Sequence, residues 1–117
     1  MDLTAQLMTF NLNVAIERVG GDEDLFKEVV ALYLQEYPEL VARIGEAVER
    51  GDAELLQQSA HTLKGSLGTL GAEPAAQNAL QLEMMGRQKR LDGATEELGV
   101  LRHALDRLHT ELEQVTR

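Results

Sequence analysis

Apolar residues recur along most of this chain at spacings of three and four, the period of an amphipathic helix. The longest run follows Asp22 and contains Phe26, Val29, Val30, Tyr33, Tyr37, Leu40, Val41, Ile44 and Val48. Pro38 falls inside this run without shifting its phase, so we expect one kinked helix rather than two. Gly51 follows the run and is suited to end the helix, and Asp52 is suited to cap the next one.

The same period predicts four more helices, over residues 12–19, 53–70, about 74–90 and 94–115. In the last of these the apolar positions alternate spacings of four and three, at Ala94, Leu98, Leu101, Leu105, Leu108, Leu112 and Val115. No segment has the alternation of a strand. Four long helices with short connections favour an all-α fold, an antiparallel up-down-up-down four-helix bundle with a short additional N-terminal helix across one end.

Composition agrees with helix packing in a single domain. The chain has 117 residues, 44% of them apolar, but only 3% are aromatic and none is Trp. A core of Leu, Val, Ala, Ile and Met suits a bundle better than a sheet sandwich. We expect residues 1–10 to be a flexible lead-in and residues 11–117 to form the domain. Leu7, Met8, Phe10 and Leu12 either seal one end of the bundle or form an apolar docking rim.

Charge and residue types exclude several classes of function. The net charge of −9 argues against nucleic acid and anionic membranes as partners. The chain has no Cys, which removes thiol nucleophiles, disulfides and thiolate metal sites. Residues 1–10 do not resemble a secretory signal and no apolar run could span a membrane, so we expect a cytoplasmic protein.

No cofactor or metal site is expected either. We place His103 and His109 on the outer flanks of the last helix, at a spacing that suits no shared metal ion. Gly65, Gly68 and Gly71 follow no strand, so they do not form a phosphate-binding loop.

The helix over residues 53–70 carries a histidine on its exposed side. Its buried stripe consists of Leu56, Ala60, Leu63, Leu67 and Leu70. At about 100° per residue, His61 points roughly 140° away from this stripe, and Gly65 and Gly68 lie on the same outer surface. A glycine inside a helix costs about 1 kcal/mol relative to alanine. Two of them beside His61 therefore indicate a surface kept clear for the approach of another protein.

This segment resembles the signature of histidine-containing phosphotransfer (HPt) domains, written His-x-Leu-Lys-Gly-Ser with Gly-Ala a few residues later. Here it reads His61-Thr62-Leu63-Lys64-Gly65-Ser66, followed by Gly71-Ala72. Helix order and length extend a weaker resemblance over residues 12–115. The resemblance implies a carrier that is phosphorylated on His61 at Nε2, without its own kinase or nucleotide site. It also implies that the metal ion and acidic pocket that assist transfer belong to the partner.

The helical hairpin predicts the neighbours of His61. His61 lies eleven residues before Ala72 and Glu83 eleven after it, so in an antiparallel pair they stand at equal height. A carboxylate at one ring nitrogen fixes the tautomer and leaves the other nitrogen as a nucleophile. Lys64 is adjacent on the same helix and Arg87 stands one turn away, where both could neutralise a phosphoryl group.

From the resemblance we expect the partners to be response-regulator receiver domains, a hybrid sensor histidine kinase, or both. We expect them to dock on Gln57, Gln58, Gly65 and Gly68. Nothing in the pattern requires more than a monomer. Two alternatives stay open: the phosphate-accepting module of a larger histidine kinase, and a non-phosphorylated helical adaptor that binds signalling proteins through the same face.

Overall fold

The computed structural model describes residues 10–116, and every regular element in that range is a helix. The helices are α2 (Leu12–Arg18), α3 (Glu23–Arg50), α4 (Ala53–Thr69), α5 (Glu73–Gln88) and α6 (Ala94–Val115). Their bounds differ from those expected by at most two residues. The all-α fold class is thereby confirmed.

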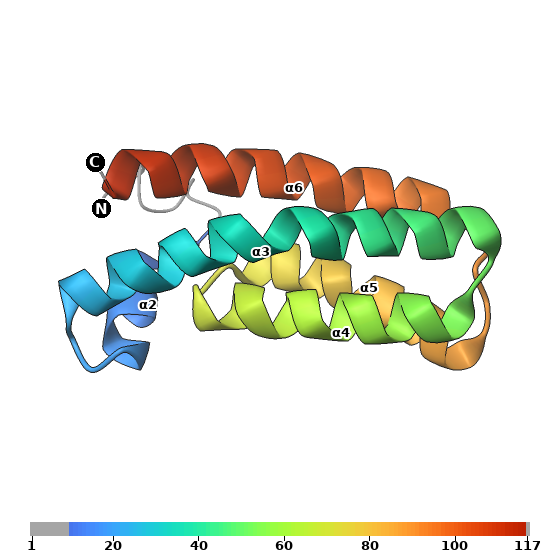
Figure 1. Ribbon diagram of the computed structural model, residues 1–117, viewed down its shortest axis with the longest axis horizontal. Helices are drawn as coiled ribbons and strands as arrows, with labels where there is room; N and C mark the ends of the chain where they lie inside the picture. Colours follow the sequence, from blue (N-terminus) through green and yellow to red (C-terminus); the bar gives the residue numbers. More distant parts are fainter. Residues whose placement is uncertain (1–9, 117) are drawn as a thin grey trace.

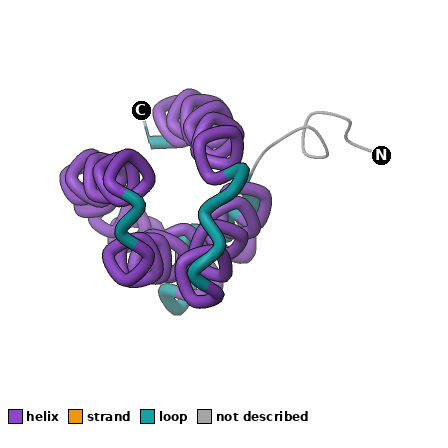
Figure 2. Tube along the Cα trace, turned by 90° about the vertical axis from the view of Figure 1, so that its right-hand side faces the viewer, coloured by secondary structure: helices purple, strands orange, loops and turns teal. Residues whose placement is uncertain are grey.

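The four long helices form an antiparallel bundle. Figure 1 shows α3 and α6 running side by side above α4 and α5, with α2 beneath one end of α3. In the view down the bundle, the four long helices surround a common centre (Figure 2). Each packs against the next along the chain, and α6 returns to contact α3. This is the expected up-down-up-down arrangement, with the short helix at one end.

Leucine and alanine dominate the core. The apolar pattern of α6 predicted which of its leucines would be buried. Leu98, Leu101, Leu105, Leu108 and Leu112 are all buried. They belong to one buried cluster with the apolar stripe of α4 and the alanines of α5. Burying each leucine contributes roughly 1.5–3 kcal/mol to folding. The bundle is therefore a stable scaffold for the side chains on its surface.

Local signals in the sequence set the helix ends. The side chain of Asp52 accepts a hydrogen bond from Leu55 N at the start of α4, and Gly51 ends α3 in the left-handed conformation with φ 68°. Pro38 lies within the uninterrupted span of α3. A proline removes one backbone donor, which a helix of 28 residues tolerates.

A backbone hydrogen bond joins the turn that follows α4 to the residue that precedes α2. Gly71 has φ 71°, and its carbonyl accepts a hydrogen bond of 3.0 Å from Asn11 N. Phe10, assigned to the lead-in, is 4% exposed, and Leu12 packs against the core. These two residues therefore help to close the end of the bundle. The other expectations for the lead-in, including Leu7 and Met8, concern residues 1–9 and lie outside the described residues.

An aromatic cluster joins α3 to α6. Tyr33 is buried, stacks on Tyr37, and forms a hydrogen bond of 2.8 Å between its hydroxyl and His109 Nε2. His109 is therefore half-buried at a helix contact, not on an outer flank as expected. Burial lowers the pKa of His109, against the opposing charge of Asp106. His103 is exposed, as expected.

Within residues 10–116, none of the helices combines the length and the apolar character that crossing a bilayer requires.

Candidate functional site

His61 projects from the middle of α4 because its neighbours anchor the opposite side of the helix. Leu56, Ala60, Leu63 and Leu67 are fully buried, whereas the side chain of His61 is 66% exposed. The register of the apolar stripe therefore decides that the imidazole faces outward.

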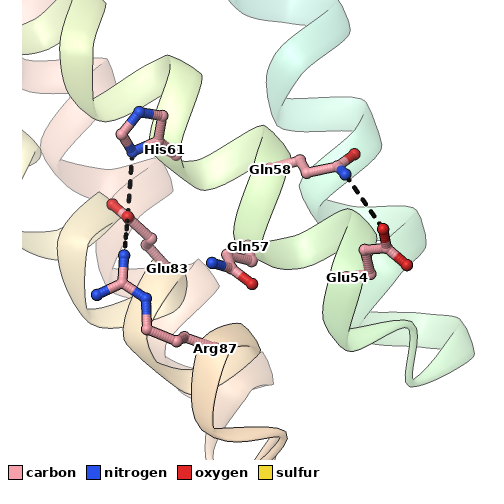
Figure 3. A pocket seen from close by; sticks show the side chains of 6 residues that line it. All are labelled: Glu54, Gln57, Gln58, His61, Glu83 and Arg87. Carbon is pink, nitrogen blue, oxygen red and sulfur yellow. Dashed lines mark hydrogen bonds and ion pairs between the residues drawn. The ribbon is translucent and has the colours of Figure 1, made fainter.

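Glu83 on α5 forms a hydrogen bond with the imidazole of His61. Its Oε2 lies 3.1 Å from His61 Nδ1, and its side chain is only 2% exposed. An ionised carboxylate can only accept hydrogen bonds, so the ring donates its Nδ1–H. In the neutral ring Nε2 then carries no proton. Figure 3 shows that this second nitrogen points away from Glu83.

Two cations share the same carboxylate. Lys64 Nζ lies 2.7 Å from Oε1, and an Arg87 guanidinium nitrogen lies 2.8 Å from Oε2. Burial acts to raise the pKa of Glu83. The contacts and charges of Lys64 and then of His61 outweigh burial and hold that pKa below its usual value. Glu83 is therefore ionised at neutral pH.

This arrangement differs in one respect from the expected one. We expected Lys64 and Arg87 to flank the histidine, where they could neutralise a phosphoryl group. In the structure both also form ion pairs with Glu83. Two positive charges around one negative charge leave a net positive charge beside His61, in a chain whose net charge is −9. The side chain of Arg87 is 60% exposed and that of Lys64 is 30% exposed. Both can therefore still reach an incoming anion.

Along α4, from Thr62 to Thr69, one strip of the outer surface carries only small, uncharged residues. Gly65 is exposed and Gly68 partly so, and a Cβ atom at either position would meet nothing within 4 Å. The hydroxyls of Thr62, Ser66 and Thr69 donate to carbonyls of their own helix. The chain thus presents a strip of backbone and satisfied hydroxyls, with neither bulk nor charge.

An open pocket of about 330 Å³ lies on the other side of His61. Figure 3 shows its lining, which consists of Glu54, Gln57, Gln58, His61, Glu83 and Arg87. The structure thus brings Gln57 and Gln58 together with the histidine and its carboxylate. Glu54, whose carboxylate accepts a hydrogen bond of 3.4 Å from Gln58, was not among the expected residues. Its position seven residues before His61, two turns along one helix face, could have identified it.

His61 thus presents an oriented Nε2, which carries no proton in the neutral ring, beside the cluster of Lys64, Arg87 and Glu83, whose net charge is positive. Such a nitrogen is a nucleophile, and the charge suits an anionic reacting group. Within residues 10–116, no three side chains of His, Asp or Glu gather in a way that could hold a metal ion.

Comparison with known proteins identifies a family for this chain. The family model described as "Hpt domain" matches residues 28–111, a range that includes His61, Lys64, Glu83 and Arg87. A search of curated proteins found no match.

Among solved structures, the chain is similar to histidine-containing phosphotransfer protein B (HptB) from Pseudomonas aeruginosa PAO1. The TM-score is 0.85 and the identity 20%, over 92% of this chain and 94% of that one. At this identity the likeness concerns the fold.

Proposed function

This chain belongs to the Hpt domain family, and we propose that it carries a phosphoryl group on His61 in a two-component His-Asp phosphorelay. A receiver domain with a phosphorylated aspartate donates the group, and a second receiver accepts it. The observation that carries this proposal is the exposed imidazole of His61, hydrogen-bonded through Nδ1 to the buried carboxylate of Glu83 at 3.1 Å.

The transfer step follows from the state of the ring. The lone pair of Nε2 attacks phosphorus in line, the N–P bond forms, and the bond from phosphorus to the aspartyl oxygen breaks. The aspartate leaves as a carboxylate and takes the bonding electrons. The ring gains positive charge as Nε2 bonds to phosphorus, and Glu83 stabilises that charge at Nδ1–H. The reverse step returns the group to a carboxylate of the next receiver.

Lys64 and Arg87 supply positive charge to the transferred group. Each is held near His61 by Glu83, at 2.7 Å and 2.8 Å from its oxygens. A phosphoryl group on Nε2 adds negative charge within reach of both side chains, and charge-assisted hydrogen bonds to it are strong. The chain itself acts as a carrier and not as a kinase.

The receiver docks on the surface around His61. Gly65 and Gly68 let the partner approach the α4 backbone, while Gln57 and Gln58 border the pocket on the other side. Receiver domains place their aspartate in a recess, and the exposed imidazole of His61 can enter such a recess. We place the protein in the cytoplasm, because the chain lacks Cys and its proposed partners are signalling proteins.

Phosphotransfer from radiolabelled receivers tests the proposal directly. Wild-type protein should acquire label that is stable in base and labile in acid, and His61→Gln should acquire none. His103→Gln is the matched control, because His103 is an exposed histidine on α6 outside the site. Full labelling of His61→Gln, or no labelling of wild type by any receiver of the source organism, would overturn the proposal. Intact partner binding by His61→Gln without any phosphorylation of wild type would favour the adaptor alternative.

A further inference from the structure

Gly86 lies where the backbones of α4 and α5 touch. A Cβ atom on Gly86 would stand 2.6 Å from Ala53 O, 2.6 Å from Gln57 N and 3.0 Å from Gln57 Cα. Ordinary van der Waals contact begins at about 3.4 Å. All three atoms belong to the backbone of α4, so no side-chain rotation could relieve the overlap. Only glycine permits this spacing of the two helices.

This contact lies one helical turn from the His61–Glu83 pair. Gly86 follows Glu83 by three residues, and Gln57 precedes His61 by four. These steps correspond to rises of about 4.5 Å and about 6 Å along the helix. The close contact at Gly86 therefore sets the distance between the α4 and α5 backbones at this height. The side chains of His61 and Glu83 must bridge that distance to form the hydrogen bond between Nδ1 and Oε2.

The three partners of Glu83 respond differently to a wider gap. Arg87 is on the same helix as Glu83 and would move with it. Lys64 reaches from α4 on a long, flexible side chain that can follow. His61 has a short, rigid side chain, and its contact of 3.1 Å is already near the upper end of about 2.7–3.2 Å for such bonds. A wider gap would therefore break the histidine contact selectively.

We propose that Gly86 is a positioning residue that holds Glu83 within reach of His61 Nδ1 and so keeps Nε2 free to react. The inference deepens the proposed function and rests on it for its consequence in transfer. Gly86 acts through Glu83 and touches no reacting atom. Its reason for being glycine is internal packing, unlike Gly65 and Gly68, whose Cβ positions are open.

The test measures the tautomer of His61 in Gly86→Ala by the ¹⁵N shifts of the ring in alkaline solution, where the imidazole is neutral. In wild type Nδ1 should be protonated and Nε2 bare. In Gly86→Ala the proton should distribute over both nitrogens, and transfer from a phosphorylated receiver should slow roughly ten- to a hundredfold.

Gly99→Ala is the matched control, because Gly99 lies within α6 and its Cβ position is open. It should leave both the tautomer and the transfer rate unchanged. It also improves helix propensity, so Gly86→Ala is measured in this background as well to keep the bundle folded.

Glu83→Met separates positioning from a general loss of structure, since it removes the acceptor while filling a similar volume. If Gly86 acts through Glu83, then adding Gly86→Ala to Glu83→Met should change the tautomer no further. A folded Gly86→Ala with the wild-type tautomer and rate would overturn the inference and leave the proposed function intact. The expected tautomers without labelling of wild type by any receiver would instead overturn the proposed function.

Discussion

The carboxylate of Glu83 is almost completely buried, yet it contacts the Nδ1 of a histidine whose side chain is two-thirds exposed. The pair thus joins the interior of the bundle to its surface. Packing fixes the carboxylate, and the carboxylate in turn fixes the ring, so the imidazole needs no cover to be oriented. An exposed but oriented nucleophile is what a carrier requires if a second protein must reach it.

Replacing Glu83 should separate the effect of an acceptor from that of a charge. Glu83→Gln keeps an oxygen that can accept the Nδ1 proton, so transfer should fall only severalfold. Glu83→Met has no acceptor, and transfer should fall on the order of a hundredfold. Single-turnover transfer from a phosphorylated receiver measures both. Equal rates for the two variants would show that the acceptor does not matter.

Acid should remove the stabilisation that Glu83 provides. Because its pKa in the folded protein lies below the ordinary 4.5, the unfolded chain binds more protons near that pH. The contribution to the free energy of unfolding is thus complete well above pH 4.5 and is lost as pH falls through the lower, native pKa.

Urea unfolding of wild type and Glu83→Gln across this range measures it. The stability difference between the two proteins should be largest at neutral pH and shrink in acid. A difference that stays constant over the whole range would contradict the ionised state assigned to Glu83.

Replacing Gly65 by alanine should stabilise the fold and slow phosphotransfer. Nothing lies within 4 Å of its Cβ position, so Gly65→Ala should raise the free energy of unfolding by about 0.5–1 kcal/mol. Transfer should nevertheless slow, because the added methyl group stands where the receiver approaches. Gly99→Ala should give a similar stabilisation with unchanged transfer. If Gly65→Ala transfers as fast as wild type, then the clearing beside His61 has no role in docking.

The contact between α3 and α6 should weaken below neutral pH. Burial lowers the pKa of His109, so the unfolded chain takes up a proton at this residue before the folded one does. Its contribution to stability is present above about pH 6.5, the ordinary value, and is lost as pH falls through the native pKa. Urea unfolding at pH values on both sides should show this loss in wild type and in His103→Gln. It should be smaller in His109→Gln, and its persistence there would assign it to another group.

The helices of this protein follow from the sequence because their signals are local. The apolar positions of α6 alternate by four and three, and Asp52 and Gly51 occupy the capping positions that such residues favour. The same period puts His61 on the exposed side of α4. Symmetry about the hairpin at Ala72 was enough to pair His61 with Glu83, since both helices rise equally per residue.

Other features depend on how the helices approach one another. Glu83 is buried where helices pack together. The ion pair between Lys64 and Glu83 joins α4 to α5, and the hydrogen bond between Tyr33 and His109 joins α3 to α6. Residue spacing sets heights and faces along one helix, but it does not set the distance between two. That distance arises from the backbone contact at Gly86 and the packing of the leucine core.

The amino-acid sequence alone determined which residues form helices and which face each one buries, because both are properties of neighbouring residues. The tertiary structure decided which side chains meet between helices and how closely. Those contacts are set by the packing of whole faces against each other, which no single segment encodes.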